Sequence, residues 1–178
     1  MDKDLQRERH HQLKGFLISH SAACISWAEK HRISATSINM LLYEVYSRVQ
    51  TTKALRKIFP KAVIEQGSGL SRYDIIVHLQ DEDLFIESKY KVNDDDEYAT
   101  DDISFPKFNS ILSLPNSYVA IPFWDGVVRI YKADNYTTIG EWTHQSKTAD
   151  EGDEITENKV VYSPVSASWT TTITTPLC

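Results

Sequence analysis

The fold is decided by Tyr73-Asp74-Ile75-Ile76-Val77-His78-Leu79 and by the run that follows it, Leu84-Phe85-Ile86-Glu87-Ser88-Lys89-Tyr90. Both runs are rich in β-branched and aromatic residues, and four polar residues, 80–83, separate them. Two strands joined by a short polar turn form an antiparallel hairpin. The sequence therefore predicts that these two runs pair with each other.

The part of the chain before this hairpin has a helical character. Residues 5–30 contain few helix breakers, and Ser34, Thr36 or Ser37 is placed to cap a second helix, which Pro60 limits. In that helix, apolar residues recur at three- and four-residue spacing, which predicts one buried face. The residues of this face are Ile38, Leu41, Leu42, Val45 and Val49.

The part after the hairpin alternates between polar segments and short apolar runs. Polar residues 93–102 predict a solvated loop, and 105–114 predict a short helix that Pro115 ends. Asp125-Gly126 lies between two β-rich runs and is the best hairpin signal in the chain. Further features are a short apolar run at 62–64, a turn at 66–69, a predicted loose acidic loop at 144–158, and predicted late strands at 159–162 and 168–173.

Helices, then strands, then a helix and more strands predict an α/β or α+β fold, with helices flanking a mixed β-sheet. The chain has 178 residues and only 6 Gly and 6 Pro, so no long flexible linker divides it and one domain is expected. We divide this domain, 1–178, into an N-terminal helical extension, 1–35, a core, 36–132, and a C-terminal extension, 133–178, whose role the sequence leaves open.

The charge of the chain is unevenly distributed. The net charge is −6, which excludes a protein that coats nucleic acid indiscriminately. Residues 1–91 carry 14 Lys/Arg against 11 Asp/Glu, whereas residues 92–178 carry 5 against 14, a net −9. One face of the molecule is thus able to meet a polyanion while the rest repels it.

Several protein classes are not expected. No apolar run approaches the roughly 18 residues of a membrane span, and the first residues, MDKDLQRERHHQLKG, are too charged for a secretory leader. We therefore expect a cytoplasmic protein with no membrane partner. Cys24 and Cys178 lie far apart in sequence without metal-ligand spacing, so neither a disulfide framework nor a structural zinc site is indicated.

Three charged residues of the hairpin form the informative constellation. Glu87 and Lys89 project from the same face of a strand, while Ser88 faces away. If the two strands pair, Asp74 lies within reach of the Glu87 carboxylate. Two carboxylates, a backbone carbonyl near Ser88 and water suit Mg²⁺, and a lysine beside such an ion can orient an attacking water.

Asp74, followed after twelve residues by Glu87-Ser88-Lys89 on predicted strands behind a helical section, resembles the PD-(D/E)XK nuclease superfamily. The resemblance implies a restriction-endonuclease-like fold and a DNA endonuclease of junction-resolving or restriction type. It also implies that Asp74 and Glu87 bind Mg²⁺, with Mn²⁺ as a substitute, that Lys89 assists the hydrolytic water, and that Glu44 completes or tunes the site. Paired cuts imply a homodimer.

A basic segment is the candidate for binding the DNA backbone. Between Val45 and Tyr73 only Glu65 opposes the positive charges, and Lys91 adds one more beyond the hairpin. The predicted nucleic-acid-binding residues are Arg48, Lys53, Arg56, Lys57, Lys61, Arg72 and Lys91. A solvated helix face that only keeps the protein soluble explains most of this segment equally well.

Simpler interpretations remain for the other charged residues. Glu87 and Lys89 form a surface cross-strand pair in the simplest interpretation, Glu44 is an i,i+4 partner of Arg48, and Lys107 is a solvated lysine. A second function is also open, a non-catalytic binding protein of nuclease fold whose acidic C-terminal half docks a basic partner. Metal-dependent cleavage of DNA separates the two functions.

Overall fold

The structure is a computed structural model that describes residues 4, 8, 30, 35–68, 71–91, 94–145 and 154–173. Two helices, nine strands and a short 3-10 helix lie in the described part. In chain order they are α3 (Ala35–Ile58), β1 (Val63–Gln66), β2 (Ile75–His78), β3 (Asp83–Ser88), β4 (Asp101–Ser104), α4 (Phe105–Leu112), β5 (Ser117–Pro122), β6 (Val127–Lys132), β7 (Thr138–Gln145), β8 (Glu154–Tyr162), η1 (Pro164–Ser166) and β9 (Trp169–Thr172).

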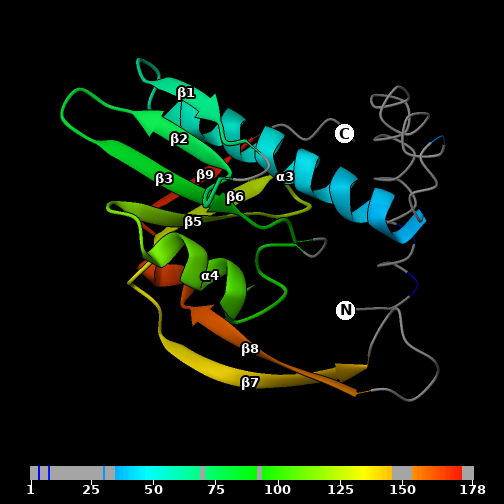
Figure 1. Cartoon of the computed structure of the whole chain (residues 1–178). Helices are drawn as coiled ribbons and strands as arrows, with labels where there is room; N and C mark the ends of the chain where they lie inside the picture. The colour runs from blue at the N-terminus through cyan, green and yellow to red at the C-terminus, as the bar shows by residue number, and fades with distance from the viewer. Residues whose placement is uncertain are drawn as a thin grey trace.

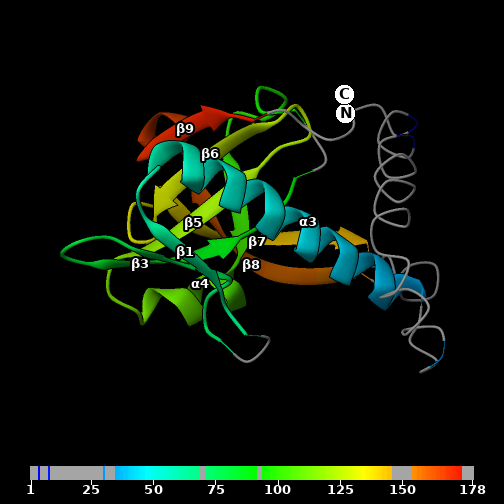
Figure 2. The ribbon, with the colours of Figure 1, turned by 90° about the horizontal axis from the view of Figure 1, so that it is seen from above.

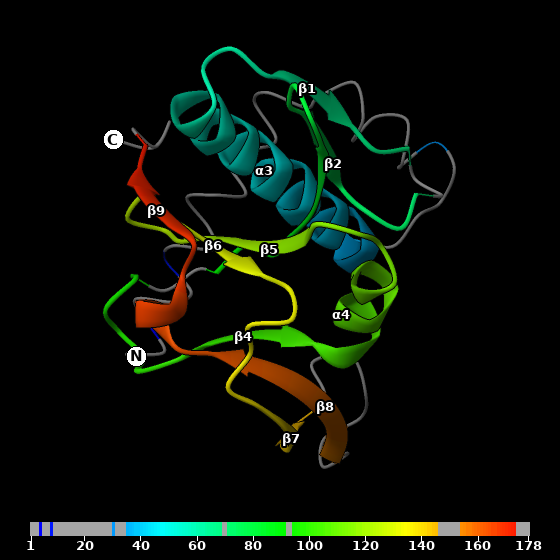
Figure 3. The same ribbon diagram turned by 90° about the vertical axis from the view of Figure 1, so that its left-hand side faces the viewer.

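The described elements form three layers (Figure 1). The central layer is a six-stranded mixed sheet with the order β1-β2-β3-β5-β6-β9, in which only β3 and β5 run parallel. Helix α3 lies across one face of this sheet (Figure 2), and α4 and a three-stranded sheet, β4-β8-β7, lie on the other side (Figure 3). The expected fold class, a mixed β-sheet flanked by helices, is confirmed.

Each face of the central sheet has its own hydrophobic core. Leu55 of α3 packs with Ile75, Ile86 and neighbouring residues on one face. On the other face, Phe108 of α4 and Tyr162 of β8 pack with residues of β5 and β6. Because both faces are covered, β3 is buried along most of its length, and a charged residue at its end needs a partner.

The two predicted hairpins are present. Strands β2 and β3 pair antiparallel, with Ile75 opposite Ile86 and Val77 opposite Leu84. Strands β5 and β6 pair through the Asp125-Gly126 turn, where Gly126 has φ of 88°, a conformation that favours glycine. The predicted helix at 105–114 is α4, and the predicted strands at 159–162 and 168–173 correspond to part of β8 and to β9, while the apolar run at 62–64 overlaps β1.

The predicted buried face of α3 is wrong where the structure describes it. Val45 and Val49 are 42% and 45% exposed, whereas Ser47, Thr51 and Leu55 are buried. The hydroxyls of Ser47 and Thr51 find a hydrogen-bond partner on the sheet, so these two polar groups are buried with their hydrogen bonds satisfied. The side chains of Ile38, Leu41 and Leu42 lie outside the described residues.

Two predicted loops contain strands. The loop expected at 144–158 includes the end of β7 and most of β8, which pair antiparallel from Thr138 opposite Val161 to Gln145 opposite Glu154. The insert expected to be loop at 93–102 leads into β4, which pairs with β8. The last part of the chain thus joins both sheets, since β9 also extends the central sheet beside β6.

Other predictions fall on residues that the structure does not describe. Of the helix expected at 5–30, only Glu8 and Lys30 are described, and Cys24 and Cys178 lie outside the described residues. Among the residues that are described, no helix combines the length and apolar character needed to cross a membrane.

Candidate metal-dependent site

Asp74 is fixed at the mouth of the β2–β3 hairpin. It precedes β2, and its backbone N–H donates to the carbonyl of Ile86 at 2.9 Å. Its side-chain Oδ2 accepts the backbone N–H of Ser88 at 2.8 Å, and the residue is only 4% exposed. Two strands thus hold one carboxylate in place, which is the preorganisation that a ligand site requires.

Arg48 of α3 links Asp74 to Glu44. Its Nη2 lies 2.6 Å from Asp74 Oδ1 and 2.7 Å from Glu44 Oε1. The i,i+4 pair of Glu44 and Arg48 expected from the sequence is therefore present, with Asp74 as an additional partner. The guanidinium neutralises the buried carboxylate of Asp74, whose burial without a partner would cost free energy of folding.

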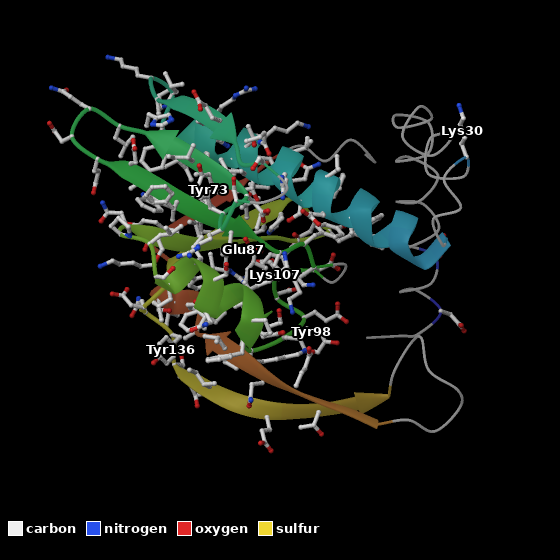
Figure 4. The ribbon with its side chains drawn as sticks, in the orientation of Figure 1. Lys30, Tyr73, Glu87, Tyr98, Lys107 and Tyr136 are labelled. Atoms are coloured by element: carbon white, nitrogen blue, oxygen red, sulfur yellow. The ribbon has the colours of Figure 1, made fainter. Side chains whose placement is uncertain are left out.

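Glu87 lies at the end of β3, 7% exposed, and faces α4. Its Oε1 accepts a hydrogen bond from Lys107 Nζ at 2.6 Å, and Figure 4 shows the two residues side by side. Burial, and next the negative charge of Asp74, raise the pKa of Glu87 to about 7 although Lys107 opposes the shift. In these contacts three carboxylates, Glu44, Asp74 and Glu87, face two cations, Arg48 and Lys107.

Ser88 points to the opposite face, as the strand alternation predicts. Its Oγ lies 2.6 Å from Ser47 Oγ and 2.7 Å from Thr51 Oγ1, both on α3. These buried hydroxyls fasten the functional end of β3 to the long helix. The side chain of Ser88 thus has a structural role, and only its carbonyl is left as a candidate metal ligand.

Replacing Ser88 by alanine tests that fastening. We expect Ser88→Ala to lower the free energy of unfolding by about 1–3 kcal/mol, because Ser47 and Thr51 lose a shared partner in a buried setting. Urea denaturation measures the change. Ser168→Ala, on an exposed serine, is the matched control, and an equal loss in both variants would contradict the role.

Lys89 lies two residues after Glu87, on the same face of the extended chain. Its backbone N–H donates to Ala120 O at 2.9 Å, and its side chain is exposed. Desolvation, and then the positive charges of Lys107 and Lys91, lower its pKa. An amine with a lowered pKa, two residues after Glu87 along the strand, is suited to orient a water and accept its proton.

The predicted DNA-binding residues are only partly brought together. Arg48, Lys53 and Arg56 line a hollow of about 490 Å³ between α3 and β1, together with Val45, Val49 and Gln66. The remaining residues are dispersed over the molecule. Lys57 donates to the Thr172 carbonyl at 3.1 Å, and Arg72 donates to the Ser113 hydroxyl at 3.3 Å. Lys91 contacts Asp102 at 2.5 Å, and Lys61 is exposed.

Lys107 is the site residue that the sequence interpretation missed. It was expected to be solvated, and it instead donates to Glu87. A signal for this position exists in α4, because Phe108 and Ile111 are buried and Lys107 lies one turn before Ile111. A lysine at the border of a buried helix face reaches the sheet beneath it.

The donor set fits a hard divalent cation that retains water. Within the described residues, no group of three or more His, Cys, Asp or Glu side chains is placed to hold a metal ion. Asp74 and Glu87 nevertheless supply two buried carboxylates, and burial, followed by the charge of Asp74, raises the pKa of Glu87. Mg²⁺ is bound in proteins by one or two carboxylates and several waters, so these residues fit it.

Comparison with known proteins finds a similarity to a solved structure. No family model and no curated protein matches the chain. Among solved structures, Hjc, a Holliday junction resolvase from the archaeal hyperthermophile Archaeoglobus fulgidus, matches with a TM-score of 0.45 and 11% identity, over 71% of this chain and 91% of that chain. This is a similarity in the arrangement of helices and strands, so the roles of side chains must be argued from the geometry of this chain.

Proposed function

We propose that this protein is a Mg²⁺-dependent DNA endonuclease that hydrolyses phosphodiester bonds. The convergence of Asp74 and Glu87, both buried at the mouth of one hairpin, is the observation that carries the proposal. Two adjacent buried carboxylates cost free energy unless a cation lies between them. Lys89 on the same strand face supplies the third group that hydrolysis needs.

Each residue then has a distinct task. Asp74 and Glu87 would hold Mg²⁺, or Mn²⁺ in its place, with the carbonyl of Ser88. When bound, the ion polarises the phosphodiester and lowers the pKa of a water. Lys89 holds the attacking water and takes its proton, while the P–O bond to one sugar oxygen breaks and that oxygen gains a proton.

Arg48 and Lys107 act as counter-charges. Arg48 pairs with Asp74, and Lys107 pairs with Glu87, each at 2.6 Å. These contacts orient both carboxylates, and a bound divalent cation would add the positive charge that favours the ionised form of Glu87. Glu44 tunes this balance through its own contact with Arg48.

The substrate is DNA, duplex or branched, bound through its phosphates. The hollow lined by Lys53 and Arg56, next to the paired Arg48, offers positive charge and is one route for the backbone. Phosphate contacts position DNA without reading its sequence. Restriction and junction resolution both require paired cuts, so we propose a homodimer that acts where DNA is found inside the cell.

A substrate panel tests the proposal. Supercoiled plasmid, linear duplex and a four-way junction are each incubated with the protein in Mg²⁺, Mn²⁺ or EDTA. We expect cleavage that requires metal. Binding without cleavage on every substrate would favour a non-catalytic protein, an alternative motivated by the cations that already occupy Asp74 and Glu87.

The metal role of Asp74 is tested separately by calorimetry. We expect Asp74→Asn to weaken Mg²⁺ binding by about 10–100-fold, because one of two charged ligands is lost while its hydrogen bond from Ser88 is retained. Asp134→Asn, in an exposed ion pair with Lys132, is the matched control. Equal Mg²⁺ affinity in the two variants would remove Asp74 from the metal site.

A further inference from the structure

A row of side chains continues beyond the proposed metal site. After β3 the chain stays extended beside β5, because the N–H groups of Lys89 and Lys91 donate to the carbonyls of Ala120 and Pro122, each at 2.9 Å. Alternate residues of an extended segment share a face. Glu87, Lys89 and Lys91 therefore form one row, with Lys91 about 7 Å beyond Lys89.

The far end of this row contacts the second sheet. Lys91 Nζ lies 2.5 Å from Asp102 Oδ1 on β4, and Lys159 Nζ of β8 lies 3.3 Å from Asp102 Oδ2. One carboxylate thus holds two amines that come from separate parts of the chain. Figure 3 shows the strands that carry Asp102 and Lys159, β4 and β8, next to each other below the central sheet.

With Lys89 included this group has an excess of positive charge, because the three lysines face two acids, Asp102 and Glu157. We call Lys91, Asp102 and Lys159 the lysine pair site. Burial alone would raise the pKa of Asp102, but the charges of Lys91 and Lys159 outweigh it and hold that pKa below its ordinary value. One ionised carboxylate therefore faces two amines with Lys89 nearby, and a further acid, Glu157, lies 3.7 Å from Lys159.

Stability does not account for the second amine. The side chains of Lys91 and Lys159 are 20% and 21% exposed, so both amines reach solvent. Partly exposed ion pairs contribute about 0–1 kcal/mol, and one lysine already neutralises Asp102. The second lysine, whose other acidic contact is Glu157 at 3.7 Å, places a further amine at a fixed position next to the proposed catalytic residues.

We propose that the lysine pair site binds a backbone phosphate of the DNA strand next to the phosphate that is cleaved. The inference rests on the proposed function and gives the second sheet a role in it. Lys89 serves the cleaved phosphate, and the next position along the row, Lys91, meets the neighbouring phosphate together with Lys159. Asp102 keeps both amines aimed at that phosphate, in the manner of a positioning residue.

The test measures the affinity of the full-length protein for a fluorescent duplex at several salt concentrations in EDTA, where no cleavage occurs. We expect Lys159→Ala to weaken binding about three- to tenfold and to lower the slope of log affinity against log salt by about one. Lys132→Ala, on a lysine half-exposed at the end of β6, is the matched control and should leave the slope unchanged.

Two more variants separate binding from a structural role. Lys159→Gln keeps most of the length of the side chain without its charge and should reproduce the loss of slope even if Lys159→Ala unfolds. Asp102→Asn removes the negative charge and should strengthen DNA binding. A purely structural triad predicts lower melting temperatures for all three variants and an unchanged salt slope, which would overturn the inference.

Cleavage of the plasmid in Mg²⁺ is measured on the same proteins. A shallower salt slope in Lys159→Ala, with no cleavage by the wild type, would support the phosphate site and contradict the proposed endonuclease activity. Cleavage by the wild type, together with an unchanged salt slope in Lys159→Ala, would support the endonuclease and contradict the phosphate site. A wild-type protein that binds none of the DNA substrates would overturn both.

Discussion

Lys89→Ala is expected to lower the single-turnover rate of DNA cleavage by about 10²–10⁴-fold, the usual contribution of a positioned proton-transfer group. Lys89 lies in the row that begins with Glu87, and desolvation and the neighbouring lysines lower its pKa. Its amine is therefore suited to take a proton from the attacking water. The rate is measured with protein in excess over a labelled duplex, so that binding does not limit it.

Two comparisons make this result specific. Lys132→Ala removes a lysine far along the chain, in an exposed pair with Asp134, and should cleave like the wild type. Lys89→Arg keeps the charge but cannot give up a proton near neutral pH, so we expect it to remain slow. Recovery of the full rate in Lys89→Arg would assign Lys89 to charge stabilisation alone.

Local sequence patterns predicted most of the central sheet. The alternation in 73–90 and the Asp125-Gly126 turn each describe strands that pair with their neighbours in sequence, and both hairpins are present. Alternation also predicted that Ser88 faces away from Glu87, which its contacts with α3 confirm. In these cases the partner lies within a few residues, where the pattern determines the register.

Long-range contacts could not be predicted in this way. Asp101 pairs with Tyr162 across sixty-one positions, so the second sheet had no local signal, and its acidic strands resembled a solvated loop. Lys107 reaches Glu87 from a different element. The buried face of α3 was misassigned because hydroxyls that pair across an interface look polar in the sequence and are satisfied only in the fold.

Glu87→Gln is expected to make the protein more stable than the wild type at pH 8. The pKa of Glu87 is raised from 4.5 to about 7, so between these values the folded state holds a proton that the unfolded state has lost. Stability contributed by the protonated form is complete below about pH 4.5 and is lost as pH rises through about 7. The advantage of the variant should approach about 3 kcal/mol at pH 8, because each tenfold change in proton affinity corresponds to about 1.4 kcal/mol.

Urea denaturation of both proteins across pH 4.5–8 measures this difference, and the other titrating groups cancel because they are common to both proteins. Glu82→Gln, on an exposed glutamate, is the matched control and should show no pH-dependent advantage. Parallel stability curves for Glu87→Gln and the wild type would mean that Lys107 fully compensates Glu87, in which case no excess charge is left for a metal ion.

Mg²⁺ should remove the same penalty in the wild type. A ligand that binds only the folded state stabilises it by about 2.7 kcal/mol at a hundred times its dissociation constant. We therefore expect Mg²⁺ to raise the melting temperature of the wild type at pH 8 and to leave Glu87→Gln nearly unchanged, because one of its two carboxylate ligands is neutral. If both proteins melt at the same temperature with and without Mg²⁺, the raised pKa of Glu87 reflects burial beside Asp74 alone, and the pair is not a metal site.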